Sequence, residues 1–358
     1  MQESMSSLYP AFYGRVLHPV YHLLKRDGFI AADRKALATD KLDAAGLTEL
    51  QRIKFSRLLR EARTRSPYYR ETIDTGAAEA ALEGVPPHAL GLPVLTRETL
   101  VERMHTLADP AIARDLIVAD GTESRVDGSA HVYTDLHTRR WRQAIEIRVR
   151  HSLGVPLGER MALLRAEVAK MPSPTSILGR LRAYQARSCV LDTSDLNEAR
   201  MAEYAERLRT FAPRLLVGPR SALVRFGEWS ASENHHIPSL RAIVSTAEPL
   251  HKEHRAVIAE TLRAPVYDRY ACHEVGCIAH ERPGTENLLI NADRILVELL
   301  DSRGQPVREG EFGSVHVTDL DNFSMPLIRY DLGDLATKGA PSGGHPYPTL
   351  AQVDRRRA

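Results

Sequence analysis

Two acidic residues in the last quarter of the chain, Glu274 and Asp334, are the side chains best suited to chemistry. Each is predicted at the mouth of a turn on a β scaffold, Glu274 shortly after an aromatic residue and Asp334 at the end of the run RYDLGD. A carboxylate has two acceptor oxygens, so one of these groups can hold a magnesium ion while the other bridges two neighbouring sugar hydroxyls. The pair therefore predicts a nucleotide site built from loops.

The segments that must position these carboxylates alternate between strands and helices. Apolar runs predict short buried strands, with helical patterns between them, at 215–218, 241–247 and 264–270. Farther along, alternating apolar residues interrupted by the turn dipeptides Arg303-Gly304 and Glu309-Gly310 predict β-hairpins. We expect an α/β fold with mostly parallel sheets flanked by helices, plus a smaller β-hairpin or barrel subdomain. Ligands in such sheets bind at the carboxyl ends of the strands.

Local signals predict where several helices begin and end. Apolar residues at helical spacing predict a helix from Leu47 to Arg65, which ends before Pro67 because the residue preceding a proline avoids the α conformation. Thr96 and Ser194 are expected to be the N-caps of two further helices. The Ala- and Pro-containing stretch from Thr75 to Pro87 is expected to be a loop.

Four runs of sequence carry a resemblance to a known family. They are STAEPL at 245–250, YDRYACHEVG at 267–276, GEFGSVHVTDL at 310–320 and PLIRYDLGD at 326–334. In this order and at these spacings they resemble the adenylate-forming enzymes, in particular the branch that contains phenylacetate–CoA ligase and the capsule-biosynthesis protein CapK. The resemblance implies the fold of the large N-terminal domain of these enzymes and a site for ATP or AMP.

The resemblance also implies roles for individual residues. The adenine would lie against the first run and stack on Tyr270, the ribose would bind Asp334, and Glu274 would hold magnesium. Ala271 stands where the family has glycine, and His273 replaces a hydroxyl residue that touches phosphate, so Glu274 and His273 are the expected catalytic residues. The set expected to bind the nucleotide is Gly121, Thr122, Ser124, Ser245, Ala247, Glu248, Pro249, Asp268, Tyr270, Ala271, Arg329, Asp334 and Arg355.

The run DGTES occupies the position of the family's phosphate loop. Gly121, Thr122 and Ser124 keep the small and hydroxyl residue types, whose backbone N–H groups and side chains can close on phosphate oxygens. Asp120 and Glu123 bring negative charge towards a polyanion, and the usual following lysine is missing. Two interpretations stay open: a degraded loop that still works, or a loop that no longer binds triphosphate.

Cys272, His273, Cys277 and His280 offer a zinc site as another use of the same segment. Their spacing does not match the paired Cys-x-x-Cys arrangement of structural zinc sites, and Glu274 between them already has a use. The magnesium interpretation is therefore preferred.

Composition restricts the class of protein. The 358 residues are 43% apolar and 26% charged, as in ordinary globular proteins. The 48 basic and 46 acidic residues give a net charge of +2, so bulk charge gives no reason to expect nucleic acid or a membrane as partner. Three cysteines cannot form a disulfide framework, and no signal-peptide pattern is present. We expect a cytoplasmic protein, for which a homodimer is one compatible state.

The resemblance divides the chain into four segments: 1–90 for the helical part of the large domain, 91–265 for its α/β sheets, 266–345 for the adenine- and ribose-binding strand with the β subdomain, and 346–358 for a hinge stub. Arg355 or Arg356 would be the hinge arginine that contacts ribose. The family's swinging C-terminal domain, with its adenylation lysine, is expected to be absent.

The expected function is activation of a small, aromatic carboxylic acid as an acyl-adenylate, with ATP and magnesium. The acyl group would then pass to an amine, alcohol or thiol in a biosynthetic pathway such as that of an antibiotic. Use of CoA and of an acceptor or carrier protein stays open. The alternative is a catalytically weak or silent homologue that binds AMP or an acyl-adenylate and needs a partner.

Overall fold

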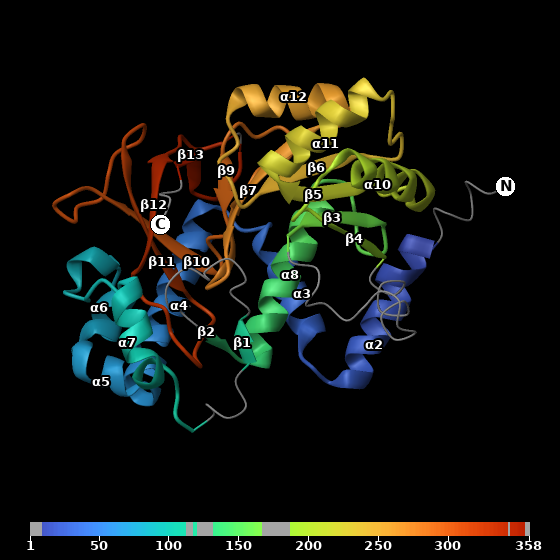
Figure 1. Cartoon of the computed structure of the whole chain (residues 1–358). Coiled ribbons are helices and arrows are strands. Elements are labelled where there is room, and N and C mark those ends of the chain that lie inside the picture. The colour runs from blue at the N-terminus through green and yellow to red at the C-terminus, as the bar shows by residue number, and fades with distance from the viewer. Residues whose placement is uncertain (1–8, 112–116, 120–131, 167–186, 343, 355–358) are drawn as a thin grey trace. The chain divides into compact units, whose positions relative to one another are not determined.

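The computed structural model describes residues 9–111, 117–119, 132–166, 187–342 and 344–354. The chain forms two compact units, each assembled from two separate segments (Figure 1). Unit 1 contains residues 1–24 and 149–270, and unit 2 contains residues 25–148 and 271–358. Within the described residues, no helix is both long enough and apolar enough to cross a bilayer.

Unit 1 is built on a parallel sheet in the strand order β4-β3-β5-β6-β7. Its strands are β3 (Met161–Arg165), β4 (Ser188–Asp192), β5 (Leu215–Pro219), β6 (Ala242–Thr246) and β7 (Val266–Cys272). The helices that connect them are α10 (Glu198–Phe211), α11 (Arg220–Ser232) and α12 (Lys252–Leu262). The three strands predicted from apolar runs are therefore confirmed.

The core of unit 1 explains why its strands read as continuous apolar runs. Four consecutive residues are buried in β5 and again in β6, as expected for parallel strands covered on both faces. Leu208 of α10, Phe226 of α11 and Ile258 of α12 are all fully buried in one cluster with Leu216 and Ile243 of these strands. Figure 1 shows α11 and α12 side by side over this part of the sheet.

Two further helical segments begin unit 1. A π-helix, η1 (Tyr13–Leu17), runs directly into α2 (His18–Lys25). The backbone of Gly158 lies against this segment, since a Cβ at Gly158 would be 2.8 Å from Pro10 Cα. Glycine is therefore required there, both for this approach and for its φ of +95°.

Unit 2 begins with helices and continues into antiparallel strands. Its helices are α3 (Phe29–Thr39), α4 (Ala44–Arg65), α5 (Pro67–Thr72), α6 (Ala77–Leu82), the 3-10 helix η2 (Pro87–Ala89), α7 (Arg97–Leu107) and α8 (Leu136–Ser152), whose end enters unit 1. Helix α4 confirms the predicted helix and its end before Pro67. Thr96 is confirmed as an N-cap, because its Oγ1 accepts a hydrogen bond from the Thr99 N–H at 3.2 Å.

The strands of unit 2 form an antiparallel arrangement in the order β10-β11-β12-β13-β9-β8. They are β8 (Gly276–His280), β9 (Leu288–Ile290), β10 (Ile295–Leu300), β11 (Phe312–Asp319), β12 (Tyr330–Lys338) and β13 (Thr349–Asp354). A separate pair joins β1 (Ile117–Ala119) to β2 (Val132–Thr134). The turn dipeptides at 303–304 and 309–310 both fall in the single connection between β10 and β11.

Two local predictions are wrong. The stretch from Thr75 to Pro87 contains helix α6, whose alanine-rich sequence AAEAAL has high helix propensity and buries Ala77, Ala78 and Ala81. Ser194 does not cap α10, because its hydroxyl bonds Asp192; the cap is Asn197, whose side chain accepts from the Arg200 N–H at 3.0 Å.

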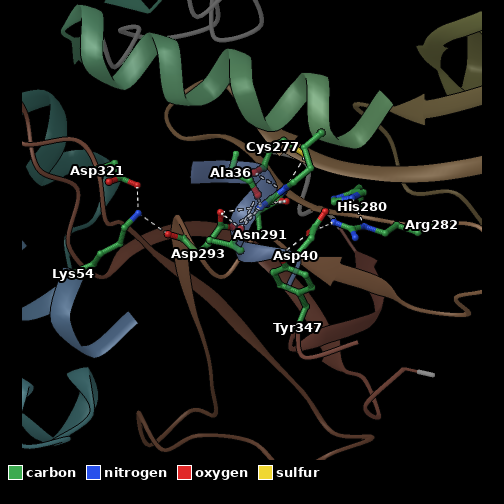
Figure 2. A network of polar contacts seen from close by, with 12 residues as sticks. Ala36, Asp40, Lys54, Cys277, His280, Arg282, Asn291, Asp293, Asp321 and Tyr347 are labelled. Atoms are coloured by element: carbon green, nitrogen blue, oxygen red, sulfur yellow. Dashed lines mark hydrogen bonds and ion pairs between the residues drawn. The ribbon is translucent and has the colours of Figure 1, made fainter. Parts of the chain in front are cut away.

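A buried polar network ties the helices of unit 2 to its strands (Figure 2). Arg148 of α8 is 1% exposed and forms a double ion pair with Asp293, at 2.8 Å to each carboxylate oxygen. Thr39 at the end of α3 donates to the same carboxylate at 3.0 Å. Although burial alone would raise the pKa of Asp293, the charge of Arg148 lowers it, so this carboxylate is ionised at neutral pH.

Candidate functional site

The turn that carries Glu274 connects β7 to β8. His273 is exposed at this turn and Glu274 is partly buried. Gly276, at the start of β8, has a φ of +84°, and a Cβ there would contact the Arg142 and Arg294 side chains at 3.5 and 3.7 Å. These are ordinary van der Waals distances, so glycine is favoured at this position by its positive φ.

Arg142 of α8 and Arg294, which precedes β10, hold the backbone of this turn. Arg142 Nη1 donates to the His273 carbonyl at 3.1 Å, and its Nη2 donates to the Glu274 carbonyl. Arg294 Nη1 donates to the Val275 carbonyl at 2.8 Å. Three consecutive carbonyls are thus fixed by two charged donors, which restricts the direction in which the Glu274 side chain leaves the turn.

Asp319 compensates the two positive charges. Its Oδ2 lies 2.6 Å from Arg294 Nη2 and 3.7 Å from Arg142 Nη2, and both Arg294 and Asp319 are fully buried. Burial, followed by the charge of Arg294, lowers the pKa of Arg142 to about 10, against the opposing effect of Asp319. The Arg142 guanidinium still carries its proton at neutral pH. Its two hydrogen bonds to the carbonyls of the turn, here called the Arg142 clamp, are therefore donated by a charged group.

Tyr330 links this turn to the run PLIRYDLGD. Its phenol donates to Glu274 Oε1 at 3.4 Å, and the ring is 2% exposed. Burial, and then the charge of Glu274, raises the pKa of the phenol far above its ordinary value. The tyrosine is therefore a neutral donor, and the contact brings together two of the runs on which the predicted site depends.

Asp334 lies in an irregular part of β12. The register against β11 changes between Ser314 and His316, so that residues 332–334 of β12 bulge out. Gly333 has a φ of +71°, and its N–H donates to Asp331 Oδ1 at 2.8 Å. The bulge interrupts the strand at the predicted ribose carboxylate, which is partly buried.

Arg329 has a structural role in unit 2. Its φ is +52°, a conformation that is uncommon for a residue with a side chain. The buried guanidinium donates to Glu298 Oε2 at 3.1 Å and to the Leu92 carbonyl at 2.6 Å. These contacts fit a residue that supports the neighbouring Tyr330 and Asp334.

The loop after β6 contains the residues predicted to hold adenine. Ala247 has a φ of +70°, which marks a tight change of direction. Glu248 accepts hydrogen bonds from the Ser221 N–H at 2.9 Å and the Ser221 hydroxyl at 2.6 Å, and its Oε2 lies 3.2 Å from Arg220 Nε. The Pro249 carbonyl accepts from Arg220 Nη1 at 3.2 Å. The Glu248 carboxylate therefore caps the N-terminus of α11.

Ser245 and Asp268 are paired in register on β6 and β7, next to this loop. Ser245 is fully buried, and none of the described residues forms a hydrogen bond with its Oγ. A buried hydroxyl without a partner is costly, so this position favours a polar ligand atom or a water molecule. Tyr270, two residues beyond Asp268 on β7, is buried.

The predicted site residues fall in both units. Unit 1 holds Ser245, Ala247, Glu248, Pro249, Asp268 and Tyr270, and unit 2 holds Ala271, His273, Glu274, Arg329 and Asp334. Gly121, Thr122, Ser124 and Arg355 lie outside the described residues. Within unit 2, the structure connects Glu274 to Tyr330 directly and places Asp334 four residues farther along the same strand.

Metal ligands of the usual types are scattered among the described residues. Among them, no three His, Cys, Asp or Glu side chains come together as a metal-binding group. The Cys277 thiol lies 3.4 Å from Asn291 Nδ2, and His280 accepts from Arg282 Nε at 3.2 Å. A magnesium ion held by nucleotide phosphates needs only one or two protein carboxylates, so Glu274 alone fits such a group.

Comparison with known proteins gives structural matches only. No family model and no curated protein sequence match the chain. An open crystal structure of 2-hydroxyisobutyryl-CoA ligase with 2-HIB-AMP and CoA matches with a TM-score of 0.68 and 20% identity over 88% of this chain and 71% of that chain. The same ligase in the thioesterification state gives 0.67 and 21% over 86% and 67%.

The fold is that of the adenylate-forming enzymes. These matches cover most of the described elements, and they agree with a mixed α/β chain in which helices flank the sheet. The predicted fold class is confirmed. At this level of identity the likeness carries no activity over to this chain.

Sequence reasoning missed the residues that hold the Glu274 turn. Asp319 lies inside the run GEFGSVHVTDL, so its position in that run was an available signal. No such signal marked Arg142 or Arg294. Each is one of 48 basic residues, and each donates hydrogen bonds to backbone carbonyls that are not its neighbours in sequence.

Proposed function

We propose that this protein activates a small carboxylic acid as an acyl-adenylate. The observation that carries the proposal is the contact between Glu274 and Tyr330, which joins the DRYACHEVG and RYDLGD runs at a turn held by two guanidinium groups. A carboxylate fixed in this way suits a divalent cation that must be positioned against phosphates.

The remaining side chains fit a bound nucleotide. Ser245 offers a buried hydroxyl, and Asp268 and Tyr270 lie on the neighbouring strand, where adenine is expected from the resemblance. Asp334 lies on a bulge where its two oxygens can accept from the ribose hydroxyls. Glu274 would hold the magnesium ion, which supplies charge neutralisation at the phosphates when it is bound.

In the proposed reaction, a carboxylate oxygen of the acid bonds to the α-phosphorus of ATP, and the bond to the pyrophosphate oxygen breaks. Such a transfer depends chiefly on alignment and on neutralising negative charge. In this chain the alignment would come from the Glu274 turn, whose backbone carbonyls accept hydrogen bonds from Arg142 and Arg294. We further propose, from the resemblance to the phenylacetate–CoA ligase branch, an aromatic acid and a thiol, amine or alcohol acceptor in a biosynthetic pathway.

A second function is favoured by one feature of the sequence. Asp120 and Glu123 in the expected phosphate loop would repel a triphosphate, which suits a protein that binds AMP or an acyl-adenylate without making it. Such a protein would be stabilised by AMP but would release no pyrophosphate.

ATP–pyrophosphate exchange with a panel of aromatic and aliphatic acids tests the proposal. We expect exchange that depends on one class of acid and is lost in Glu274→Gln. The matched control is Glu286→Gln, the same change at an exposed position between β8 and β9. No exchange with any acid, together with a melting temperature that still rises with AMP, would support the second function instead.

A further inference from the structure

Exposed apolar side chains are concentrated in one short segment of the protein. Among the described residues, thirteen large apolar side chains are exposed, and seven of them lie between Phe12 and Leu24. Leu23 and Leu24 are the most exposed of the seven, at 67% and 79%. The full set is Phe12, Val16, Leu17, Val20, Tyr21, Leu23 and Leu24. Exposed apolar side chains gathered on one short segment mark an interaction site more often than a scattered set does.

The helix presents its apolar side outwards and its polar side inwards. The buried side chains of α2 are His18 and His22, whose Nε2 atoms lie 3.1 Å apart. This is the reverse of a helix that packs on a protein core, where the apolar stripe is the buried one. The segment is anchored at its start, where Pro10 and Gly14 contact Gly158 and Leu157.

The charge of the segment has one sign. Residues 9–26 contain no aspartate or glutamate, and Arg15, Lys25 and Arg26 are exposed. The chain as a whole is nearly neutral at +2, so this is a local concentration that bulk charge does not reveal. Apolar residues beside exposed basic residues on one helix are typical of segments that lie in the interface of a membrane.

We propose that the helical segment of residues 9–26 docks the protein on an anionic lipid surface. The seven apolar side chains would enter the boundary between headgroups and acyl chains, and the three basic residues would pair with phosphate or carboxylate groups of the lipids. A second copy of the chain is a poorer occupant, because a two-fold contact would bring the same basic residues together. The inference does not depend on the proposed enzymatic activity.

Binding to vesicles tests this proposal with the full chain. We expect co-sedimentation with vesicles that contain about one third phosphatidylglycerol and much weaker binding to phosphatidylcholine alone. Raising the salt concentration from roughly 0.05 M to roughly 0.5 M should weaken the binding, since exposed charges are then screened.

Two variants separate the apolar and the basic contributions. The double change Leu23→Glu and Leu24→Glu should lower the affinity for anionic vesicles at least about tenfold, and Lys25→Gln by about threefold. Phe312→Glu is the matched control, because Phe312 is 70% exposed but lies on β11 in unit 2. Leu23→Ala with Leu24→Ala gives the same test without added charge, and circular dichroism verifies that each variant is folded.

Three results would overturn the proposal. The first is absence of binding to anionic vesicles, and the second is equal binding by the Leu23 and Leu24 variants and the Phe312 control. The third is a dimer in lipid-free solution that the leucine changes dissociate, which would make a second copy the occupant of this face. Adenylation activity in solution is a separate measurement, so failure of one proposal leaves the other intact.

Discussion

Two glutamates from the recognised runs, Glu274 and Glu248, are used in opposite ways. At Glu274 the backbone is held by two arginines, while the carboxylate has only weak partners among the described residues, the Tyr330 hydroxyl at 3.4 Å and the Cys272 thiol. At Glu248 the carboxylate itself is engaged, by two hydrogen bonds from Ser221 and an ion pair with Arg220.

This difference shows that the fold can be stabilised through the backbone of one motif residue and through the side chain of another. A turn that must offer its side chain to a ligand is stabilised through its carbonyls, so that the side chain keeps its acceptor capacity. A loop that only needs a fixed path can use its side chain as a helix cap. The resemblance predicts nucleotide contact for both glutamates, and we expect only Glu274 to use its carboxylate for that contact.

The largest expected effect comes from breaking the buried support of the Glu274 turn. Arg294→Gln leaves the buried Asp319 carboxylate with a single charged partner, Arg142, at the longer distance of 3.7 Å. Removing one member of a buried ion pair costs about 3–5 kcal/mol of unfolding free energy. Urea unfolding measures the loss. Arg209→Gln, which breaks the exposed pair with Glu206, is the control and should have a much smaller effect.

The next effect concerns the position of Glu274. Arg142→Gln removes the donors to two carbonyls of the turn, and a displacement of about 1 Å at the reacting groups lowers rates by up to about 100-fold. We expect a 10- to 100-fold lower exchange rate and a higher magnesium requirement, with partial recovery in Arg142→Lys.

Arg140→Gln is the control for this change, since Arg140 is on the same helix but pairs with Asp27 and Gln143. An Arg142 variant with normal magnesium dependence and a normal rate would mean that the clamp is not needed to orient Glu274.

A smaller effect is expected at Glu248. Glu248→Ala removes the acceptor at the N-terminus of α11 and should cost about 1 kcal/mol of unfolding free energy, the usual value of a helix cap. Asn197→Ala removes the cap of α10 and should cost a similar amount. If Glu248→Ala raises the ATP concentration for half-maximal exchange at least about tenfold while Asn197→Ala does not, the contrast between the two glutamates is wrong.

The smallest effect is expected for Tyr330→Phe. The hydrogen bond to the Glu274 carboxylate is long, so we expect it to be worth only about 0.5 kcal/mol, or roughly a two- to threefold change in rate. Because the pKa of the phenol is raised far above its ordinary value, Tyr330 stays protonated from about pH 6 to pH 9. The pH–rate profiles of the variant and of the natural protein should therefore run parallel.

Local structure was predictable wherever one short segment decides it. Strands β5 and β6 each have four consecutive buried residues, and the cap at Thr96 needs only its own first turn. The cap of α10 was predicted at the wrong residue because Ser194 and Asn197 are both suitable, and the helix start decides between them. Helix α6 was missed because its six residues lie between turn formers.

The candidate site was predictable only in part. Glu274, Asp334 and the loop after β6 stand in recognisable runs, so their residue types were informative. The Arg142 clamp was not, because it joins residues 131 and 132 positions apart through backbone carbonyls, which any residue possesses. The use of Glu248 as a helix cap could not be predicted either, since it depends on Ser221 of helix α11.

The assembly of unit 2 from two distant segments has a consequence for biosynthesis. Thr39 and Asp293, which are hydrogen-bonded, are 254 positions apart, and the bonded pair Asp40 and Tyr347 are 307 apart. A ribosome that adds 5–20 residues per second needs roughly 10 s to make residues 149–270. Every segment of unit 1 has then been synthesised, whereas Asp293, the carboxylate partner of Arg148, has not. Unit 1 can therefore begin to fold first, and unit 2 closes late in translation.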